Sequence, residues 1–148
     1  MKTNTENEYS EIAADLKKRL EGDVHFDRYS RLLYSTDASM YQIEPIGVVV
    51  PRHKGDVQAV IETANKFNAP VLPRGGGTSL AGQTVGHAIV LDFSKYMKNV
   101  LDVNQEELWC RVQPGLVQDE LNAYVRPMGL QFGPDTSTSN RATIGGMI

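Results

Sequence analysis

The sequence has one cysteine, no long apolar run and no strong excess of either charge, and each shortage excludes a class of protein. The single Cys110, without a cluster of cysteines and histidines, rules out an internal disulfide framework and a zinc or iron–sulfur site built by this chain. No apolar run approaches the roughly 20 residues that a membrane-spanning helix needs. A net charge of −3 offers no broad basic surface for nucleic acid. We therefore expect a soluble globular protein, and we interpret Cys110 as an inert strand thiol.

The two ends of the chain differ in character. Residues 1–8 are polar and contain no apolar signal-peptide core, so we expect a cytoplasmic protein, with peripheral attachment to the inner face of the membrane left open. Residues 145–148 stop inside a glycine-rich turn pattern without a polar tail. Natural domains seldom end within an element, so we expect an amino-terminal fragment of a longer protein. Ile144, Met147 and Ile148 would then be uncovered and would favour self-association through this end.

Hydrophobic patterning predicts a β-α-β unit at the centre of the chain. The β-branched run 46–50 has the composition of a strand buried on both faces, and it is expected to open the folded unit. Asp56 is the predicted cap of a helix, and the run 70–73 is strand-like again, so the two strands should be parallel with a right-handed crossover. The other expected elements are a helix capped by Ser10 with Ile12 and Leu16 on one face, an unassigned segment over 24–44, a strand over 87–92, an antiparallel hairpin of 100–104 with 108–112, and a helix over 117–125 with Leu121 and Tyr124 inward.

The second strand of this unit leads into three successive glycines, from Gly75 to Gly77. Glycine has no Cβ, so such a loop allows positive φ angles and a close approach of a ligand to the main chain. Successive N–H groups can form a concave nest for phosphate. Thr78 and Ser79 add hydroxyl donors, and Arg74 adds a fixed positive charge. The loop is thus predicted to bind an anion at the carboxyl end of a strand, and a flexible glycine linker is the alternative.

Two known phosphate motifs fit this loop only in part. The dinucleotide fingerprint G-x-G-x-x-G, started at Gly75, has Leu80 in place of its third glycine. The P-loop pattern, started at Gly77, has Gln83 in place of its lysine. Glutamine cannot supply the positive charge used in phosphoryl transfer, so a nucleotide hydrolase is disfavoured and binding of a diphosphate remains.

Two loops together resemble a known family. They are P-R-G-G-G-T-S-L-A-G-Q over 73–83 and G-P-D-T-S-T-S-N-R-A-T-I-G-G over 133–146, and they resemble the FAD-linked oxidase family, whose flavin fold is shared with vanillyl-alcohol oxidase and p-cresol methylhydroxylase. The resemblance implies an α+β FAD-binding fold of the p-cresol methylhydroxylase type. The chain would hold its first subdomain, with the β-α-β unit and further strands, and the start of the second. Residues 1–33 would form an amino-terminal helical segment, and residues 34–148 the amino-terminal part of the FAD-binding domain, truncated at the carboxyl end.

The resemblance also implies which residues meet the cofactor. The first loop would wrap the FAD pyrophosphate, and the second would approach the pyrophosphate and the flavin-proximal part. Some relatives attach the flavin through a histidine directly after the glycines, where this chain has Thr78, so non-covalent FAD is implied. An iron–sulfur module downstream stays open, and no metal ligand or catalytic residue is implied within the chain. The expected cofactor contacts are Arg74, Gly75, Gly76, Gly77, Thr78, Ser79, Gly82 and Gln83 in the first loop, and Pro134, Asp135, Ser137, Thr138, Thr143, Gly145 and Gly146 in the second.

The implied activity is oxidation of a D-2-hydroxyacid of the lactate, glycolate or 2-hydroxyglutarate type. Hydride would pass to the flavin, and electrons to a quinone, a carrier or an iron–sulfur module. We expect the isolated chain to be inactive and to hold FAD weakly, because half of the binding surface would be missing. Two alternatives stay open: a flavin reductase of the UDP-N-acetylmuramate-forming type, and a non-catalytic nucleotide-binding module. His25, His53 and His87 are expected to be surface or structural residues, because none lies in a motif with a carboxylate or nucleophile.

Overall fold

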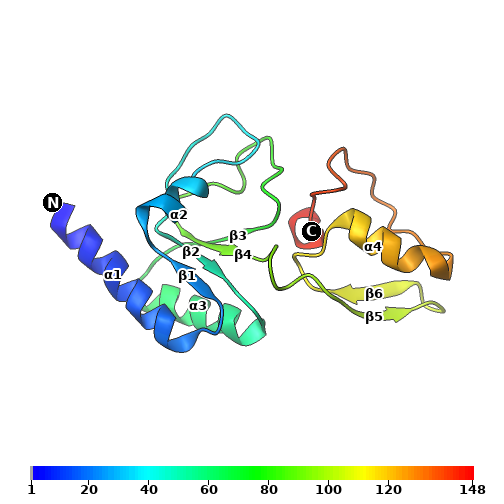
Figure 1. The fold of residues 1–148 in the computed structure, drawn as a ribbon, viewed down its shortest axis with the longest axis horizontal. Helices are drawn as coiled ribbons and strands as arrows, with labels where there is room; N and C mark the ends of the chain where they lie inside the picture. The colour runs from blue at the N-terminus through cyan, green and yellow to red at the C-terminus, as the bar shows by residue number, and fades with distance from the viewer. Residues whose placement is uncertain (1) are drawn as a thin grey trace.

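The computed structural model describes the backbone of residues 2–148 and the side chains of residues 6–148. The chain forms two packed units, each with its own apolar cluster, which lie beside each other in Figure 1. We call residues 2–92 the sheet unit and residues 100–148 the hairpin unit. The sheet unit contains α1 (Lys2–Arg19), β1 (Asp23–His25), α2 (Arg28–Leu33), β2 (Gly47–Val50), α3 (Lys54–Lys66), β3 (Val71–Arg74) and β4 (Ile89–Asp92), and the hairpin unit contains β5 (Val100–Asn104), β6 (Trp109–Val112), α4 (Gln118–Val125), the 3-10 helix η1 (Arg126–Met128) and α5 (Ile144–Met147).

The sheet unit is built on a mixed sheet with the strand order β1-β2-β4-β3. β2 and β3 are both parallel to β4, which lies between them, and β1 is antiparallel to β2. The predicted β-α-β unit with parallel strands is confirmed, with α3 as its helix. The strand that follows, β4, inserts between the two. Every residue of β2 and β4 is buried, which is why their sequences are continuous apolar runs rather than alternating ones.

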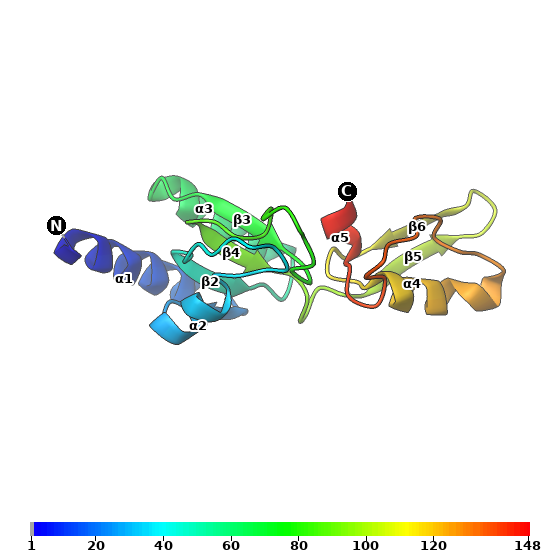
Figure 2. The same cartoon turned by 90° about the horizontal axis from the view of Figure 1, so that it is seen from above.

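Helices cover both faces of the sheet. Figures 1 and 2 show the strands lying between α3 and α2. α1 packs against α3 on one of these faces, and the predicted apolar face of α1 is confirmed by its buried Ile12 and Leu16. The core cluster on this face consists of Ile12, Leu16, Ile46, Val49, Val60, Ala64, Ile89 and Leu91.

The amino-terminal part contributes more to the sheet unit than the sequence indicated. α1 begins at Lys2, so the predicted cap Ser10 lies inside the helix, where its Oγ donates to the carbonyl of Glu6 at 2.9 Å. The segment 24–44, unassigned from the sequence, contains most of β1 and all of α2. Because β1 pairs with β2, the prediction that the run 46–50 opens the folded unit is wrong.

The predicted cap at the start of α3 is also wrong. His53 is the N-cap, and its Nδ1 accepts the N–H of Asp56 at 3.2 Å. Asp56 lies in the first turn and is buried, and its carboxylate accepts the N–H groups of Glu21 and Arg52 at 3.0 and 2.8 Å. These two donors follow α1 and β2 in the chain. The carboxylate therefore ties three elements together instead of capping one helix.

The hairpin unit confirms the predicted antiparallel pairing of β5 with β6. On α4, Leu121 is buried as predicted. Tyr124 is 52% exposed, so the prediction that its side chain points inward is wrong. Ile144 is also buried, in the cluster around Leu116 and Leu121, so the expectation that it would be uncovered is wrong, whereas Ile148 is exposed. The glycine-rich end of the chain forms the short helix α5 rather than a turn. Across residues 2–148, no helix is both long and apolar enough to cross a membrane.

Candidate cofactor-binding site

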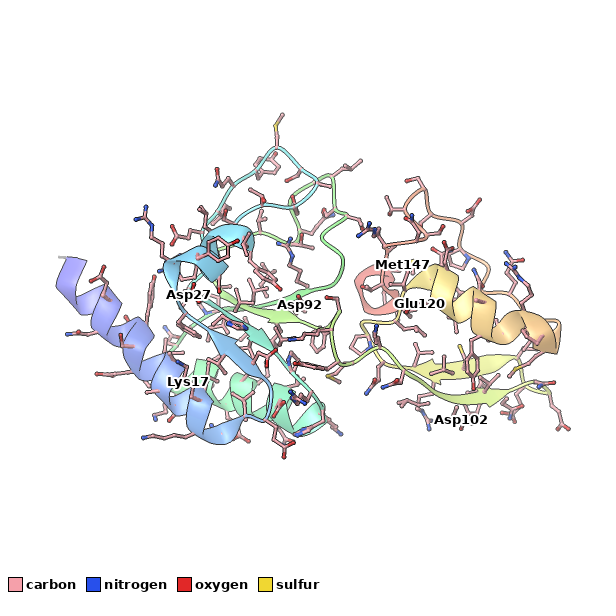
Figure 3. The ribbon with its side chains drawn as sticks, viewed as in Figure 1. Lys17, Asp27, Asp92, Asp102, Glu120 and Met147 are labelled. Carbon is pink, nitrogen blue, oxygen red and sulfur yellow. The ribbon has the colours of Figure 1, made fainter. Side chains whose placement is uncertain are left out.

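Two loops meet where the sheet unit faces the hairpin unit. The glycine loop, residues 75–84, leaves the end of β3, and the second loop, residues 133–143, leads into α5. Figure 3 shows Asp92 at the end of β4 and Met147 on α5 on the facing edges of the two units. A cavity of about 480 Å³ opens between the loops. It is lined by Gly75, Gly76, Gly77, Thr78, Ser79, Leu80, Ala81, Gln83 and Thr84 from the glycine loop side, and by Thr136, Thr138, Ala142, Thr143, Gly146 and Met147 from the other.

The close contact between the two loops requires glycine at two positions. A Cβ atom on Gly75 would overlap the Oγ1 of Thr143, and one on Gly76 would lie 2.5 Å from the carbonyl oxygen of Arg141. Gly77 differs, because its φ of +65° is unfavourable for any residue with a Cβ. From the sequence, these glycines were predicted to allow the approach of a ligand. The structure adds that the first two allow the second loop to approach.

The polar part of the cavity wall is neutral, and Leu80, Ala81, Ala142 and Met147 add apolar surface. Within residues 2–148, the main-chain N–H groups of residues 76–79 donate to no protein acceptor. The Oγ of Ser79 accepts the N–H groups of Ala81 and Gln83 at 3.2 and 3.3 Å, so its own proton is free to donate into the cavity. None of the described lining residues is Asp, Glu, Lys, Arg or His. Without a carboxylate to repel it, a diphosphate fits a wall of N–H and hydroxyl groups.

Arg74 lies beside the cavity but not in its lining. Its Nη1 donates to the carbonyls of Tyr34 and Thr84 at 3.3 and 3.1 Å, and its Nη2 donates to the carbonyl of Thr36 at 2.8 Å. The guanidinium also lies over the ring of Tyr34, 5.3 Å from the centroid. A Cβ on Gly77 would come within 2.7 Å of Nη2. The charge that the sequence analysis assigned to the anion thus contacts main-chain carbonyls behind the glycine loop.

Two carboxylates near Arg74, those of Asp92 and Asp37, accept hydrogen bonds from neighbouring hydroxyls. The Oη of Tyr34 donates to the buried Asp92 at 2.6 Å, and burial followed by this hydrogen bond raises the pKa of Tyr34 far above its usual range. Burial alone would raise the pKa of Asp37, but hydrogen bonds from Ser39 and Thr84 outweigh it and lower that pKa. At neutral pH the phenol is therefore a donor and the Asp37 carboxylate an acceptor.

The second loop is held by α4. Gln118 is buried, its Nε2 donates to the carbonyl of Pro134, and its Oε1 accepts the hydroxyl of Thr136 at 2.7 Å. Farther along, the carbonyl of Thr138 accepts the N–H groups of Arg141 and Ala142 at 2.8 and 2.7 Å. Sequence reasoning missed Gln118. The only signal was a polar residue in the first turn of an amphipathic helix, which is common on exposed surfaces.

The structure brings together part of the predicted contact set. Gly145 packs against Pro114 instead. Six further residues line the cavity without having been predicted as contacts: Leu80, Ala81, Thr84, Thr136, Ala142 and Met147. The predicted residues that line the cavity are Gly75, Gly76, Gly77, Thr78, Ser79, Gln83, Thr138, Thr143 and Gly146. Those outside its lining are Arg74, Gly82, Pro134, Asp135, Ser137 and Gly145.

The other candidate residues have structural or surface positions. His87 is paired at both ring nitrogens, with the Oη of Tyr9 at 2.9 Å and the carbonyl of Glu44 at 3.1 Å. Cys110 is exposed on β6. In the part of the chain that the structure describes, no group of three or more His, Cys, Asp or Glu side chains is arranged to hold a metal ion.

Known proteins are similar to this chain in sequence and in fold. The family model for FAD-binding domains matches residues 45–148. The chain is 45% identical over 130 residues to the D-2-hydroxyglutarate dehydrogenase of Pantoea ananatis, an alignment that covers 86% of this chain and 13% of that protein. It is 35% identical over 145 residues to glycolate oxidase subunit GlcD of Bacillus subtilis, covering 93% of this chain and 31% of that one.

A solved structure supports the expected architecture. The structure of p-cresol methylhydroxylase with substrate bound aligns with a TM-score of 0.67 at 17% identity, covering 84% of this chain and 25% of that one. The predicted α+β fold of the p-cresol methylhydroxylase type is therefore confirmed. Since the family model extends from just before β2 through both loops to the last residue, the chain belongs to the family of FAD-binding domains found in FAD-linked oxidases.

Proposed function

We propose that this chain is part of an FAD-dependent D-2-hydroxyacid dehydrogenase, with D-2-hydroxyglutarate as the first substrate to test. One observation carries the proposal: the cavity between the two loops contains free N–H groups and hydroxyls but no carboxylate in its lining, in a chain 45% identical to a D-2-hydroxyglutarate dehydrogenase. The chain spans only 13% of the length of that relative, so substrate, electron acceptor and catalytic groups all belong to the proposal.

In this proposal the cavity holds the FAD pyrophosphate. The N–H groups of residues 76–79 donate to its oxygens, with the hydroxyls of Thr78, Ser79 and Thr138 beside them. Neutral donors suit a charge that is spread over several oxygens, as at other nests of main-chain N–H groups. The contacts expected outside the cavity lining, at Pro134, Asp135, Ser137 and Gly145, would serve the flavin-proximal part of the cofactor. Gly82, whose φ is +78°, would shape the glycine loop.

The chemistry would be divided between the cofactor and other parts of the protein. Bound FAD supplies a hydride acceptor for oxidation of the hydroxyacid. No lining side chain of the described cavity is an acid or base, so we propose that the groups that remove the substrate hydroxyl proton lie outside this chain. Thr78 lies where some relatives have the histidine that attaches the flavin, and it lacks an imidazole, which supports non-covalent binding. Electrons would then pass from the flavin to a quinone, a carrier protein or an iron–sulfur module.

The full-length protein tests this function directly. It should be purified, its flavin released by acid precipitation and identified, and dye reduction followed with D-2-hydroxyglutarate, D-lactate, glycolate and the L-enantiomers. We expect released FAD and dye reduction that depends on a D-2-hydroxyacid. FAD without hydroxyacid oxidation would favour the flavin reductase alternative. No flavin, together with tighter binding of ATP than of FAD, would favour the nucleotide-binding module.

A further inference from the structure

Arg74, the residue before the three glycines, directs its side chain to main-chain carbonyls and not into the cavity. Arg74 ends β3 and uses two terminal nitrogens to donate to three carbonyl oxygens, from Tyr34, Thr36 and Thr84. All three acceptors belong to the main chain. A planar guanidinium can serve several acceptors in fixed directions, which an ammonium group cannot do in the same way.

These carbonyls belong to two segments that are far apart in sequence. Tyr34 and Thr36 follow α2, whereas Thr84 ends the glycine loop. The same two segments are joined by the N–H of Ala38, which donates to the carbonyl of Gly77 at 3.0 Å. They are joined again by the hydroxyl of Thr84, which donates to the carboxylate of Asp37 at 2.8 Å. Arg74 therefore lies at the centre of a tie between residues 34–38 and the glycine loop.

The surroundings of Arg74 disfavour a second task at the anion. Its charge already faces three carbonyl dipoles and the ring of Tyr34, and the Tyr34 hydroxyl is held by Asp92 at 2.6 Å. To reach a phosphate in the cavity, the guanidinium would have to lose these acceptors and move past Gly77. Nη2 lies so close to Gly77 that a Cβ atom on this residue would clash with it. Charged hydrogen bonds of this kind are among the stronger ones in proteins.

We propose that Arg74 is a positioning residue for the cofactor site. It holds the glycine loop in the conformation that presents the N–H groups of residues 76–79 to the cavity, and its guanidinium does not contact the phosphate. The inference rests on the proposed FAD function for the meaning of the site. Arg74 orders the glycine loop whether or not a ligand is bound, because its contacts are all with the protein.

The test compares Arg74→Lys and Arg74→Gln with Arg111→Gln in the full-length protein. Arg111 is exposed on β6, its guanidinium lies over the ring of Trp109, and its loss removes the same charge from a residue outside the two loops and the cavity lining. Hydrogen exchange is measured by mass spectrometry after removal of FAD, over peptides that contain Ala38 and Val85, because their N–H groups donate to carbonyls of the glycine loop. FAD affinity is then measured by flavin fluorescence.

We expect both Arg74 variants to exchange faster at these peptides without FAD, and to bind FAD about tenfold or more weakly, whereas Arg111→Gln changes neither. Arg74→Lys keeps the charge but not the planar fork, so it should not rescue binding. The proposal is overturned if exchange in the FAD-free protein is unchanged, or if Arg74→Lys binds FAD like the natural protein while Arg74→Gln does not. If Arg74→Gln fails to fold, Arg74→Lys alone decides. If the natural protein binds no FAD, the proposed function fails, and the exchange measurement still tests the loop-ordering claim.

Discussion

Gly75 and Thr143 approach so closely that a Cβ atom on the glycine would overlap the threonine Oγ1. The two residues belong to different units and different loops, and both line the cavity. This contact explains why the chain needs glycine at the first position after β3, where φ is not positive. It also makes the distance between the loops sensitive to a single methyl group.

Gly75→Ala should therefore separate the loops. Overpacking of this kind costs about 1–3 kcal/mol, and we expect the loss in the free energy of unfolding together with weaker FAD binding. Gly133→Ala is the matched control, because nothing lies within 4 Å of a Cβ at that position. Thr143→Ala in the Gly75→Ala background should restore part of the stability, since it removes the overlapping Oγ1. Urea unfolding of the single and double variants measures this coupling, and additive effects would contradict it.

Thr78→Asp should weaken binding at the anion site. It would introduce a carboxylate into a wall that contains none. Two like charges about 4 Å apart near a protein surface repel by about 4 kcal/mol, so FAD affinity should fall about 100-fold or more. Thr78→Ser keeps the hydroxyl and should bind FAD nearly as well as the natural protein. Flavin fluorescence titration of the full-length protein measures the FAD affinity of both variants. If Thr78→Asp binds FAD as tightly as the natural protein, the pyrophosphate does not bind in this cavity.

Gln118→Leu should loosen the second loop. The change removes the hydrogen bonds that Gln118 makes with the carbonyl of Pro134 and the hydroxyl of Thr136, and a typical hydrogen bond contributes about 0.5–1.5 kcal/mol to stability. Gln58→Leu is the control, because Gln58 is exposed on α3. Thermal unfolding should show a lower midpoint for Gln118→Leu only. Equal midpoints for the two variants would mean that α4 does not hold the loop through this side chain.

Asp15 should make the docking of α1 on α3 depend on pH. A hydrogen bond from Lys66, then one from Thr63, lowers the pKa of Asp15 below its usual 3.8, against a smaller opposing effect of burial. A carboxyl group with a lowered pKa in the folded state stabilises the fold above its unfolded pKa, and this contribution is lost as pH falls through the lower folded value. Asp15→Asn should thus be less stable than the natural protein at pH 7, and the difference should shrink below about pH 4.

Thermal unfolding between pH 2.5 and pH 7, a range chosen to bracket the usual carboxyl pKa, checks this prediction. Asp102→Asn, a change of an exposed residue on β5, serves as the control and should leave the pH profile of stability unchanged. Parallel profiles for Asp15→Asn and the natural protein would show that the pairing with Lys66 contributes nothing to the docking of α1.

Local patterns predicted the buried strand β2 and the hairpin of β5 with β6. The run at β2 and the hairpin of β5 with β6 follow from side-chain burial and alternation, which each segment carries by itself. The caps at Ser10 and Asp56 were wrong because several polar residues near a helix start can accept an N–H group. The choice among them depends on which other segment lies nearby, as Asp56 shows by accepting from Glu21 and Arg52.

By itself, the sequence determined that a strand runs into a phosphate-type glycine loop and that a second small-residue loop follows, because glycines and hydroxyls act through their own backbone and side-chain chemistry. Only the tertiary structure decided which partner each of these residues meets. Gly75 and Gly76 face Thr143 and Arg141, and Arg74 reaches back to the carbonyls after α2. Such contacts join segments distant in the chain, and they form only when both units pack and bring the two loops together.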